Sequence, residues 1–499
     1  MMRAEGVTVK GQRLLGAGAW TAACPRRQLW ARLGDLGRAD ASVSAPLRQG
    51  RVLANVRSTM PASATDRSPT DALVAAVQSN DANATRSLLA RHPELAARLD
   101  DPLPGLHFDG ILLGAAVQRS NREMVDLLLG AGADINARSH WWAGGFGVLD
   151  SCDPAFAPFL IERGARVDAN AASRLGMLDT LRRIVESDPT AVNARGGDGQ
   201  TPLHVAATVE IAAYLLDHGA DIDALDVDHE STPAQYLVTD HPHVARFLVE
   251  RGCRTDIMLV AALGDVARVE AHLKADPASI LTSVTGQHFP MRNPRAGGHI
   301  YIWTLGAAKS PHVIAHERGH TAVFDLLMER SHDGLKLARA CELGDEAAVN
   351  TLLERRPRLA DTLPSEEWRR LADAAEMGNT KAALLMLRAG WPVDVRGAHG
   401  ATPLHFAAWR GDAELARALL ARGAPVDVRD DEYDGPPLGW AVYGAANSPC
   451  RDRGDYAATT EALLDAGATL PRNVDPTDES EGTEAVRAVI RKYVERGRA

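Results

Sequence analysis

The sequence predicts an all-α solenoid, an irregular stack of helix-turn-helix units with short β-turn fingers and occasional insertions. Two observations lead to this fold class. Short segments of similar sequence recur from residue 70 onward. In five of the copies, an inter-helix turn residue lies twelve positions before the end of the second helix. Similarity at a fixed period is the signature of a repeat architecture. Aromatic residues make up only 5% of the 499 residues, which is few for a β-sandwich.

The first 59 residues differ in charge from the rest of the chain. They contain ten basic and three acidic residues and so carry +7, which leaves −17 for residues 60–499 because the whole chain carries −10. Such an acidic body repels phosphate backbones, so we expect no nucleic-acid binding. Three interpretations of residues 1–59 stay open. They are an export signal with a lipoprotein-like box before Cys24, a disordered basic arm, or a mis-assigned start with Met60 as the true first residue.

Two segments carry the repeat most clearly. Thr201–Ala207 reads T-P-L-H-V-A-A and Thr402–Ala408 reads T-P-L-H-F-A-A. The threonine suits a helix N-cap, and the proline suits the first helical position, where no N–H is needed. These segments, each followed by L-L-x-x-G-A, resemble ankyrin repeats. The resemblance implies a concave recognition face made from finger tips and first helices, and it implies that His204 and His405 hold adjacent repeats together.

Spacing identifies the weaker copies. The five turn-and-terminus pairs are Gly411 and Gly423, Gly378 and Gly390, Gly176 and Asp188, Gly264 and Asp276, and Gly344 and Arg356. The same spacing gives about twelve units in total. Seven end in a glycine suited to a left-handed C-cap: Gly132, Gly164, Gly219, Gly252, Gly390, Gly423 and Gly467. Four end in a residue followed by proline, which stops a helix: Pro93, Pro189, Pro277 and Pro357.

The predicted domain organisation follows from these units. A basic N-terminal segment, residues 1–59, precedes a first ankyrin sub-array at 70–281. An insertion at 282–309 separates it from a second sub-array at 310–469, and 470–499 supply a C-terminal capping helix. Within the insertion, His299–Thr304 alternates apolar and β-prone residues. The alternation favours a β-hairpin packed over the groove, and the alternative is a lid or a contact specific to a partner.

Residues 316–320 spell H-E-R-G-H, a match to the H-E-x-x-H motif of zinc proteases. That chemistry needs both histidines on one face of a continuous helix. The repeat register instead places His316 near the end of a first helix and Gly319-His320 in the inter-helix turn. A metal-dependent hydrolase that uses His316, Glu317 and His320 is therefore only a minor alternative. A chance zinc site would draw on the other histidines nearby, which we expect to be ordinary surface and turn residues: His299, His312 and His332.

Catalytic motifs and cysteine pairs are both missing from the sequence. It contains no G-x-S-x-G, P-loop or Rossmann glycine motif. The acidic neighbours of Cys152 are expected to raise the pKa of its thiol. We therefore expect no enzyme activity, no cofactor and no metal. The five cysteines are far apart and form no C-x-x-C, which fits a reducing, cytoplasmic location: Cys24, Cys152, Cys253, Cys341 and Cys450.

The candidate binding residues are those that the repeat register places on the concave face and at the finger tips. Consecutive first helices supply Glu376, Trp409, Arg410 and Tyr443. The finger tips supply Trp141, Trp142, Asp198, Gln200, His229, His399, Glu432 and Tyr433. Tryptophan, tyrosine and arginine are the residues that most often anchor interfaces. The alternative is that Trp409 packs only on Tyr443 and that Trp141 and Trp142 fill a distorted finger.

Together these features predict a non-catalytic scaffold that binds a partner protein on the concave face of an ankyrin stack. The acidic body favours a partner with a basic surface. An alternative of a different class is an exported lipoprotein or secreted effector that uses the same surface. No run of eighteen apolar residues occurs, so no membrane span is expected.

Overall fold

The computed structural model describes residues 68–470 and 482–498. The predicted segment 1–59, with Cys24, and the proposed start at Met60 lie outside these residues. Within the described ranges the chain forms helices and no β-strand, which confirms the predicted all-α solenoid. None of these helices combines the length and apolarity needed to cross a lipid bilayer.

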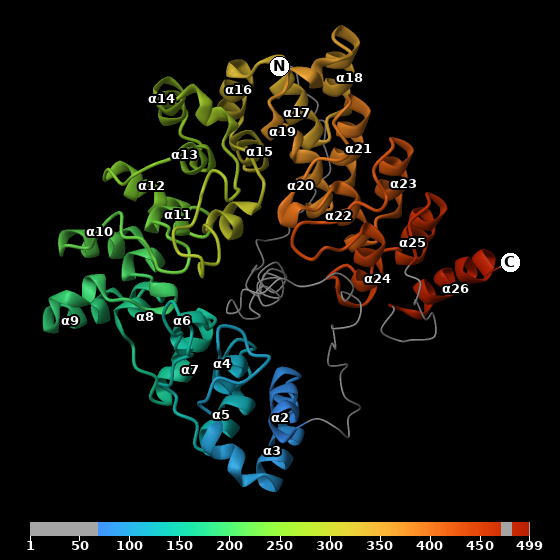
Figure 1. The fold of residues 1–499 in the computed structure, drawn as a ribbon. Helices are drawn as coiled ribbons and strands as arrows, with labels where there is room; N and C mark the ends of the chain where they lie inside the picture. Colours follow the sequence, from blue (N-terminus) through green and yellow to red (C-terminus); the bar gives the residue numbers. More distant parts are fainter. Residues whose placement is uncertain (1–67, 471–481, 499) are drawn as a thin grey trace, which may run out of the picture.

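Helix pairs follow one another around an open arc (Figure 1). The first six pairs are α2 (Pro69–Gln78) with α3 (Ala82–Arg91), α4 (Leu112–Val117) with α5 (Arg122–Gly130), α6 (Val148–Ser151) with α7 (Ala157–Glu162), α8 (Ala169–Arg174) with α9 (Leu178–Ser187), the 3₁₀-helix η5 (Pro202–Val205) with α10 (Val209–Asp217), and α11 (Pro233–Leu237) with α12 (Pro242–Glu250).

The other six pairs are α13 (Ile257–Leu263) with α14 (Val266–Ala275), α15 (Pro311–Glu317) with α16 (Thr321–Arg330), α17 (Asp333–Leu343) with α18 (Glu346–Arg355), α20 (Arg370–Met377) with α21 (Thr380–Ala389), α22 (Pro403–Arg410) with α23 (Ala413–Ala421), and α24 (Pro437–Asn447) with α25 (Tyr456–Asp465). The short helix α19 (Ser365–Trp368) precedes α20, and α26 (Glu484–Arg498) ends the stack. First helices such as α11, α13, α22 and α24 lie on the inner side of the arc, and second helices lie on the outer side (Figure 1).

The connections contain short helical turns. They are η1 (Pro93–Arg98), η2 (Pro154–Phe156), η3 (Pro189–Asn193), η4 (Gly197–Gly199), η6 (Pro277–Leu281), the π-helical η7 (Ile302–Gly306), η8 (Leu359–Thr362) and η9 (Ala398–Gly400). The predicted proline stops Pro93, Pro189 and Pro277 each begin a 3₁₀ turn. All seven predicted terminal glycines have positive φ, between 81° at Gly423 and 107° at Gly132. The local chemistry that ends the helices was therefore predicted correctly.

The predicted β-hairpin in the insertion is wrong. Residues 282–309 contain no strand, and η7 replaces it. Tyr301 is fully buried and its hydroxyl donates to Asp256 Oδ2 at 2.9 Å, while the Ile300 N–H donates to Ser231 Oγ at 3.2 Å. The alternating residues thus find partners in neighbouring repeats instead of in a second strand. In Figure 1 the insertion lies on the inner side of the arc, beside α11.

Three main hydrophobic clusters form the core, within residues 73–171, 169–327 and 337–468. The middle cluster includes Tyr301 of the insertion, so the insertion is part of the packing. The division into two sub-arrays stays a prediction. A fourth, small cluster forms where α26 packs on the last pair, and it consists of Ala445, Tyr456, Val486 and Ile490.

A buried ion network joins the insertion to α17, α19 and α20. Arg339 donates to Glu342 at 2.6 Å and to Glu367 at 2.8 Å, and Arg370 donates to the same two carboxylates and to the Ala308 carbonyl at 3.2 Å. Burial disfavours ionisation of Glu367, but the two arginines outweigh it and lower the pKa of Glu367 to about 2. Any movement that separated one arginine from its carboxylates would leave an uncompensated buried charge. Because such a charge is strongly unfavourable, the network fixes the orientation of these helices relative to one another.

Candidate functional site

Three consecutive first helices form the inner face of the C-terminal repeats. α20, α22 and α24 carry Glu376, Trp409 with Arg410, and Tyr443, respectively. α22 begins at the predicted Thr402-Pro403 and ends at Gly411, whose φ of 66° gives the left-handed cap that turns the chain into α23. The structure therefore places the four predicted inner-face residues on adjacent elements.

Four aromatic side chains, Trp409, Tyr433, Trp440 and Tyr443, form a continuous cluster, which we call the aromatic patch. Trp409 stacks on Tyr443 with ring centroids 6.0 Å apart and an interplanar angle of 21°. Trp440 meets Trp409 edge-on at 6.3 Å and Tyr433 edge-on at 6.1 Å. The two tyrosines are 38% and 39% exposed, so the patch presents apolar surface to solvent. Such exposed aromatic clusters mark interaction sites.

Sequence analysis missed Trp440 and Met377. Trp440 lies three residues before Tyr443 on α24, and residues at this spacing share a helix face, so the signal was available. Met377, next to Glu376 on α20, is 39% exposed. Its exposed side chain adds apolar surface to α20, the helix that packs against α22.

The finger before α24 is fixed by one buried carboxylate. Asp430 accepts hydrogen bonds from Trp440 Nε1 at 3.0 Å and from the backbone N–H groups of Tyr433 at 2.6 Å and Gly435 at 3.0 Å. At the finger tips, His399 Nδ1 contacts Glu432 Oε2, and the His399 ring lies 5.6 Å from Tyr433. Burial, with the nearby Glu432 carboxylate, raises the pKa of Tyr433 to about 12. The patch therefore has a polar, acidic edge.

Arg410 and Glu376 form the other edge of the patch. Arg410 Nη1 donates to the Glu376 carbonyl oxygen at 3.1 Å, and its guanidinium lies over Gly378, where a Cβ would clash with it. Burial, and then the nearby Asp373 carboxylate, raise the pKa of Glu376 to about 7. An acidic side chain held partly neutral in this way would ionise more readily beside an added cation.

Trp141 and Trp142 are not part of the aromatic patch. Trp141 meets Phe108 edge-on at 5.2 Å, and the Arg295 guanidinium lies 4.6 Å from the centre of the Trp142 ring. Both tryptophans thus pack in the finger before α6, and Arg295 belongs to the insertion.

The H-E-x-x-H match is split between two helices, as the repeat register predicted. His316 belongs to α15, whereas His320 caps α16 and its Nε2 lies 3.0 Å from the Ala262 carbonyl oxygen. The Glu317 carboxylate is paired with Lys309. The two histidines therefore do not share the helix face that a zinc protease needs.

The four described cysteines are buried and free: Cys152, Cys253, Cys341 and Cys450. Burial raises the pKa of the Cys253 and Cys341 thiols to about 12. The pKa of Cys152 is also raised, chiefly by burial, and the acidic neighbour Asp153 adds only a small part of the expected effect. High thiol pKa values keep Cys152, Cys253 and Cys341 protonated and poorly nucleophilic.

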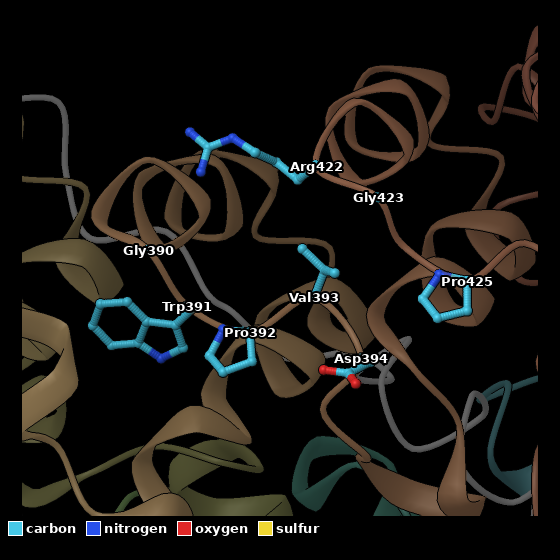
Figure 2. A pocket seen from close by; sticks show the side chains of 8 residues that line it. All are labelled: Gly390, Trp391, Pro392, Val393, Asp394, Arg422, Gly423 and Pro425. Carbon is cyan, nitrogen blue, oxygen red and sulfur yellow. The ribbon is translucent and has the colours of Figure 1, made fainter.

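An open hollow of about 360 Å³ lies between the ends of α21 and α23, as Figure 2 shows. Trp391 borders it, but this side chain is buried and donates through Nε1 to the Glu367 carbonyl at 3.2 Å. The only charged groups in its lining are Asp394 and Arg422, and no nucleophile with a neighbouring base is among them. The hollow thus lacks the chemistry of a catalytic site.

One cluster of possible metal ligands lies within the described residues, at a different pair of fingers. It consists of Asp198, Asp228 and His229, whose ligand atoms lie within 4.8 Å of one another. Asp198 and His229 were predicted as binding residues at finger tips, but all three side chains are buried.

Comparisons with known proteins agree on the repeat. The model "Ankyrin repeats (3 copies)" matches residues 169–258 and 337–430, and the model "Ankyrin repeat" matches 111–140. Among solved structures, the human ASB11 ankyrin repeat domain is 19% identical, with a TM-score of 0.24. The alignment covers 61% of this chain and 100% of the ASB11 chain.

Curated relatives match over short segments. Palmitoyltransferase akr1 of Schizosaccharomyces pombe is 38% identical over 65 residues, 12% of this chain and 10% of that protein. Serine/threonine-protein kinase VIK of Arabidopsis thaliana is 45% identical over 49 residues, 9% of this chain and 11% of that protein. Ankyrin repeat and SAM domain-containing protein 6 of Rattus norvegicus is 27% identical over 157 residues, 30% of this chain and 18% of that protein. The chain thus spans less than a fifth of the length of each.

Proposed function

Because the chain is an ankyrin repeat protein, and such repeats indicate a scaffold for protein–protein interaction, we propose that the inner face of its C-terminal repeats binds a partner protein without catalysis. The aromatic patch supports this proposal most strongly. Trp409, Tyr443 and Arg410 are of the residue types that most often anchor interfaces, and two tyrosines of the patch are more than a third exposed. Trp440 contacts Trp409 and Tyr433 and donates a hydrogen bond to Asp430, and such fixed packing reduces the conformational entropy lost on binding.

The charge around the patch favours a partner with a basic surface. The side chains of Asp431, Glu432 and Asp434 in the finger are 74%, 45% and 68% exposed, and each already lies beside one basic side chain, that of Arg396, His399 and Arg429, respectively. Glu376, at the opposite edge, would ionise when a cationic group approaches it. Complementary charges at the rim speed association and select partners, while the aromatic centre supplies most of the affinity. The same acidic rim disfavours nucleic acid.

The free cysteines support a cytoplasmic location for this scaffold. Disulfides are common in oxidising compartments and rare in the cytosol. Each of the four described cysteines is buried and unbridged.

Site-specific photo-crosslinking tests the proposed face. A photo-reactive amino acid at position 443 should crosslink one partner in lysate of the native cell, whereas the same group at position 214, on the outer helix α10, should not. Trp409→Ala should weaken binding of that partner about tenfold or more, the usual effect of an anchor residue. Tyr214→Ala is the matched control, because it truncates an aromatic side chain of α10, a helix on the outer side of the arc (Figure 1). Equal crosslinking at both positions, or equal loss in both variants, would contradict the proposed face.

A further inference from the structure

We propose that Asp198, Asp228 and His229 form a binding site for a divalent transition-metal ion such as Zn²⁺. The site lies between two consecutive fingers and the insertion, away from the aromatic patch. It goes beyond the proposed function and differs from the expectation from sequence that the protein binds no metal. The two aspartates are 8% and 3% exposed, and the histidine is 8% exposed.

The histidine is held in the orientation of a metal ligand. Its Nδ1 lies 2.7 Å from the Gly298 carbonyl oxygen, and because a carbonyl can only accept, Nδ1 must carry the proton. This bond directs Nε2 at the two carboxylates, 3.6 Å from Asp228 Oδ2 and 3.9 Å from Asp198 Oδ2. Both separations are too long for a direct hydrogen bond. A backbone carbonyl that fixes the far nitrogen of a histidine is the usual second partner of a metal-ligating imidazole.

The spacing of the three ligand atoms suits a small cation. Zinc bound at about 2.0–2.2 Å brings neighbouring ligand atoms to roughly 3.3 Å from one another. Binding would therefore shorten the distances from Nε2 to Asp228 Oδ2 and Asp198 Oδ2 by about 0.3 and 0.6 Å. Because all three ligand atoms lie within 4.8 Å of one another, no pair would have to approach by more than about 1.5 Å. One imidazole with two carboxylates favours zinc over calcium or magnesium, which prefer oxygen ligands alone.

The formal charge of the three ligands also matches a divalent cation. Two carboxylates and a neutral imidazole carry a formal charge of −2, which one divalent cation equals in magnitude.

The backbone around the site is built from three segments that already contact one another. The Asp198 carbonyl oxygen accepts hydrogen bonds from the N–H groups of Val227 at 2.8 Å and Asp228 at 3.2 Å. The Gly297 N–H donates to Asp228 Oδ1 at 3.1 Å. A Cβ at Gly297 would lie only 3.0 Å from Asp228 Oδ2, so glycine leaves the space in which that carboxylate can move. A bound ion would link both fingers and the insertion at one point.

Zinc titration of the full chain tests the proposal. After removal of metal with EDTA, titration calorimetry with ZnCl₂ should show one site with a Kd of about 1 µM or tighter. Asp198→Asn and Asp228→Asn keep the size of each side chain and should each weaken zinc binding at least about tenfold. Glu432→Gln is the matched control, because Glu432 occupies the equivalent place in the C-terminal finger, and it should leave the affinity unchanged. Absence of zinc binding in the wild type, or unchanged affinity in both asparagine variants, would overturn the proposal.

A second measurement does not depend on how the variants fold. X-ray absorption of the zinc-loaded wild type should show only nitrogen and oxygen ligands, with a single imidazole. A sulfur ligand, or two or more imidazoles, would place the zinc elsewhere and overturn the assignment. Hydrogen exchange should also slow on zinc addition in residues 226–231 and 296–300, and unchanged exchange there would contradict a link between finger and insertion.

Discussion

The two T-P-L-H motifs, 201 residues apart in the sequence, form the same local arrangement of hydrogen bonds. We call this arrangement a bracket, because it joins the motif to the next finger. In each, the threonine N–H donates to the histidine Nδ1, at 3.0 Å for Thr201 and His204 and at 3.1 Å for Thr402 and His405. In each, the histidine Nε2 donates to a carbonyl of the next finger, at 3.1 Å and 3.0 Å. The next finger is also fixed alike, because Asp226 accepts from the Tyr236 hydroxyl at 2.8 Å just as Asp430 accepts from Trp440.

The elements that follow the two brackets differ. After Thr402 the chain forms the eight-residue helix α22, which ends at Gly411 and carries Trp409 and Arg410. After Thr201 it forms only the four-residue η5, because this repeat is three residues shorter before its terminal glycine. The motif therefore determines how repeats are held together, whereas the length that follows it determines whether the repeat presents a recognition surface.

The fingers that follow the two motifs also differ in their exposure, because the insertion covers only the first of them. Asp228 and His229 lie under Gly297 and Gly298 of the insertion, whereas the equivalent Glu432 and Tyr433 are exposed. The same framework thus supports a buried polar site in one place and an open aromatic surface in the other.

The largest expected effect on stability comes from a substitution at Gly411, in the turn that only the longer of the two T-P-L-H repeats contains. In Gly411→Ala the new Cβ would lie 2.9 Å from the Gly454 Cα, at a φ of 66° that alanine rarely adopts. We expect a loss of about 3 kcal/mol in the free energy of unfolding, from a strained backbone and an overpacked contact. Urea unfolding followed by circular dichroism measures it.

Gly423→Ala is the control for this turn. Gly423 also has positive φ, 81°, but a Cβ there meets nothing within 4 Å. This variant should lose only about 1 kcal/mol, from backbone strain alone. Equal losses in the two variants would show that the close approach of α22 to Gly454 is not important for stability.

An intermediate effect tests whether the two brackets are equivalent. Burial lowers the pKa of both His204 and His405 to about 4, against about 6.5 when unfolded. As the pH falls below 6.5, these histidines become protonated in the unfolded chain but stay neutral in the folded chain. The free energy of unfolding therefore decreases, by about 2 kcal/mol per histidine at pH 5. His204→Gln and His405→Gln remove this dependence.

Each glutamine variant should be less stable than the wild type at pH 7, because hydrogen bonds are lost. In both variants, the difference in unfolding free energy between wild type and variant should be about 2 kcal/mol smaller at pH 5 than at pH 7. Narrowing in only one variant would mean that the two brackets are not equivalent. The other buried histidines do not disturb this test because they are common to wild type and variant.

Much of the fold could be predicted because local chemistry determines it. Glycine and proline stops, together with a spacing of twelve residues between the inter-helix turn and the end of the second helix, located the helix ends without any knowledge of tertiary contacts. The insertion could not be predicted in this way. Its alternation of apolar residues suited a strand, but Tyr301 and Ile300 bond to Asp256 and Ser231, which are remote in sequence.

The candidate site was predicted only in part, for the same reason. Register placed Trp409, Arg410, Tyr443 and Glu376 on adjacent helices, because the repeat period fixes which positions point inward. No local feature of the sequence indicates that His229 is buried, since Gly298 of the insertion, which covers it, lies 69 residues later. The packing of Trp142 also depends on Arg295 of that insertion.

The smallest expected effect tests how accessible the Glu376 carboxylate, on the inner face beside α22, is to water. The folded protein raises the pKa of Glu376 to about 7, so it keeps a proton that the unfolded chain releases above pH 4.5. Stability is therefore lost as the pH rises from 4.5 through 7. Because Glu376 remains partly exposed, we expect Glu376→Gln to gain only about 1 kcal/mol at pH 8, and less at pH 5. Glu414→Gln, at an exposed position on α23, should change stability equally at both pH values. A gain for Glu376→Gln that does not vary with pH would mean that water reaches this carboxylate freely, and that the acidic edge is already ionised before a partner arrives.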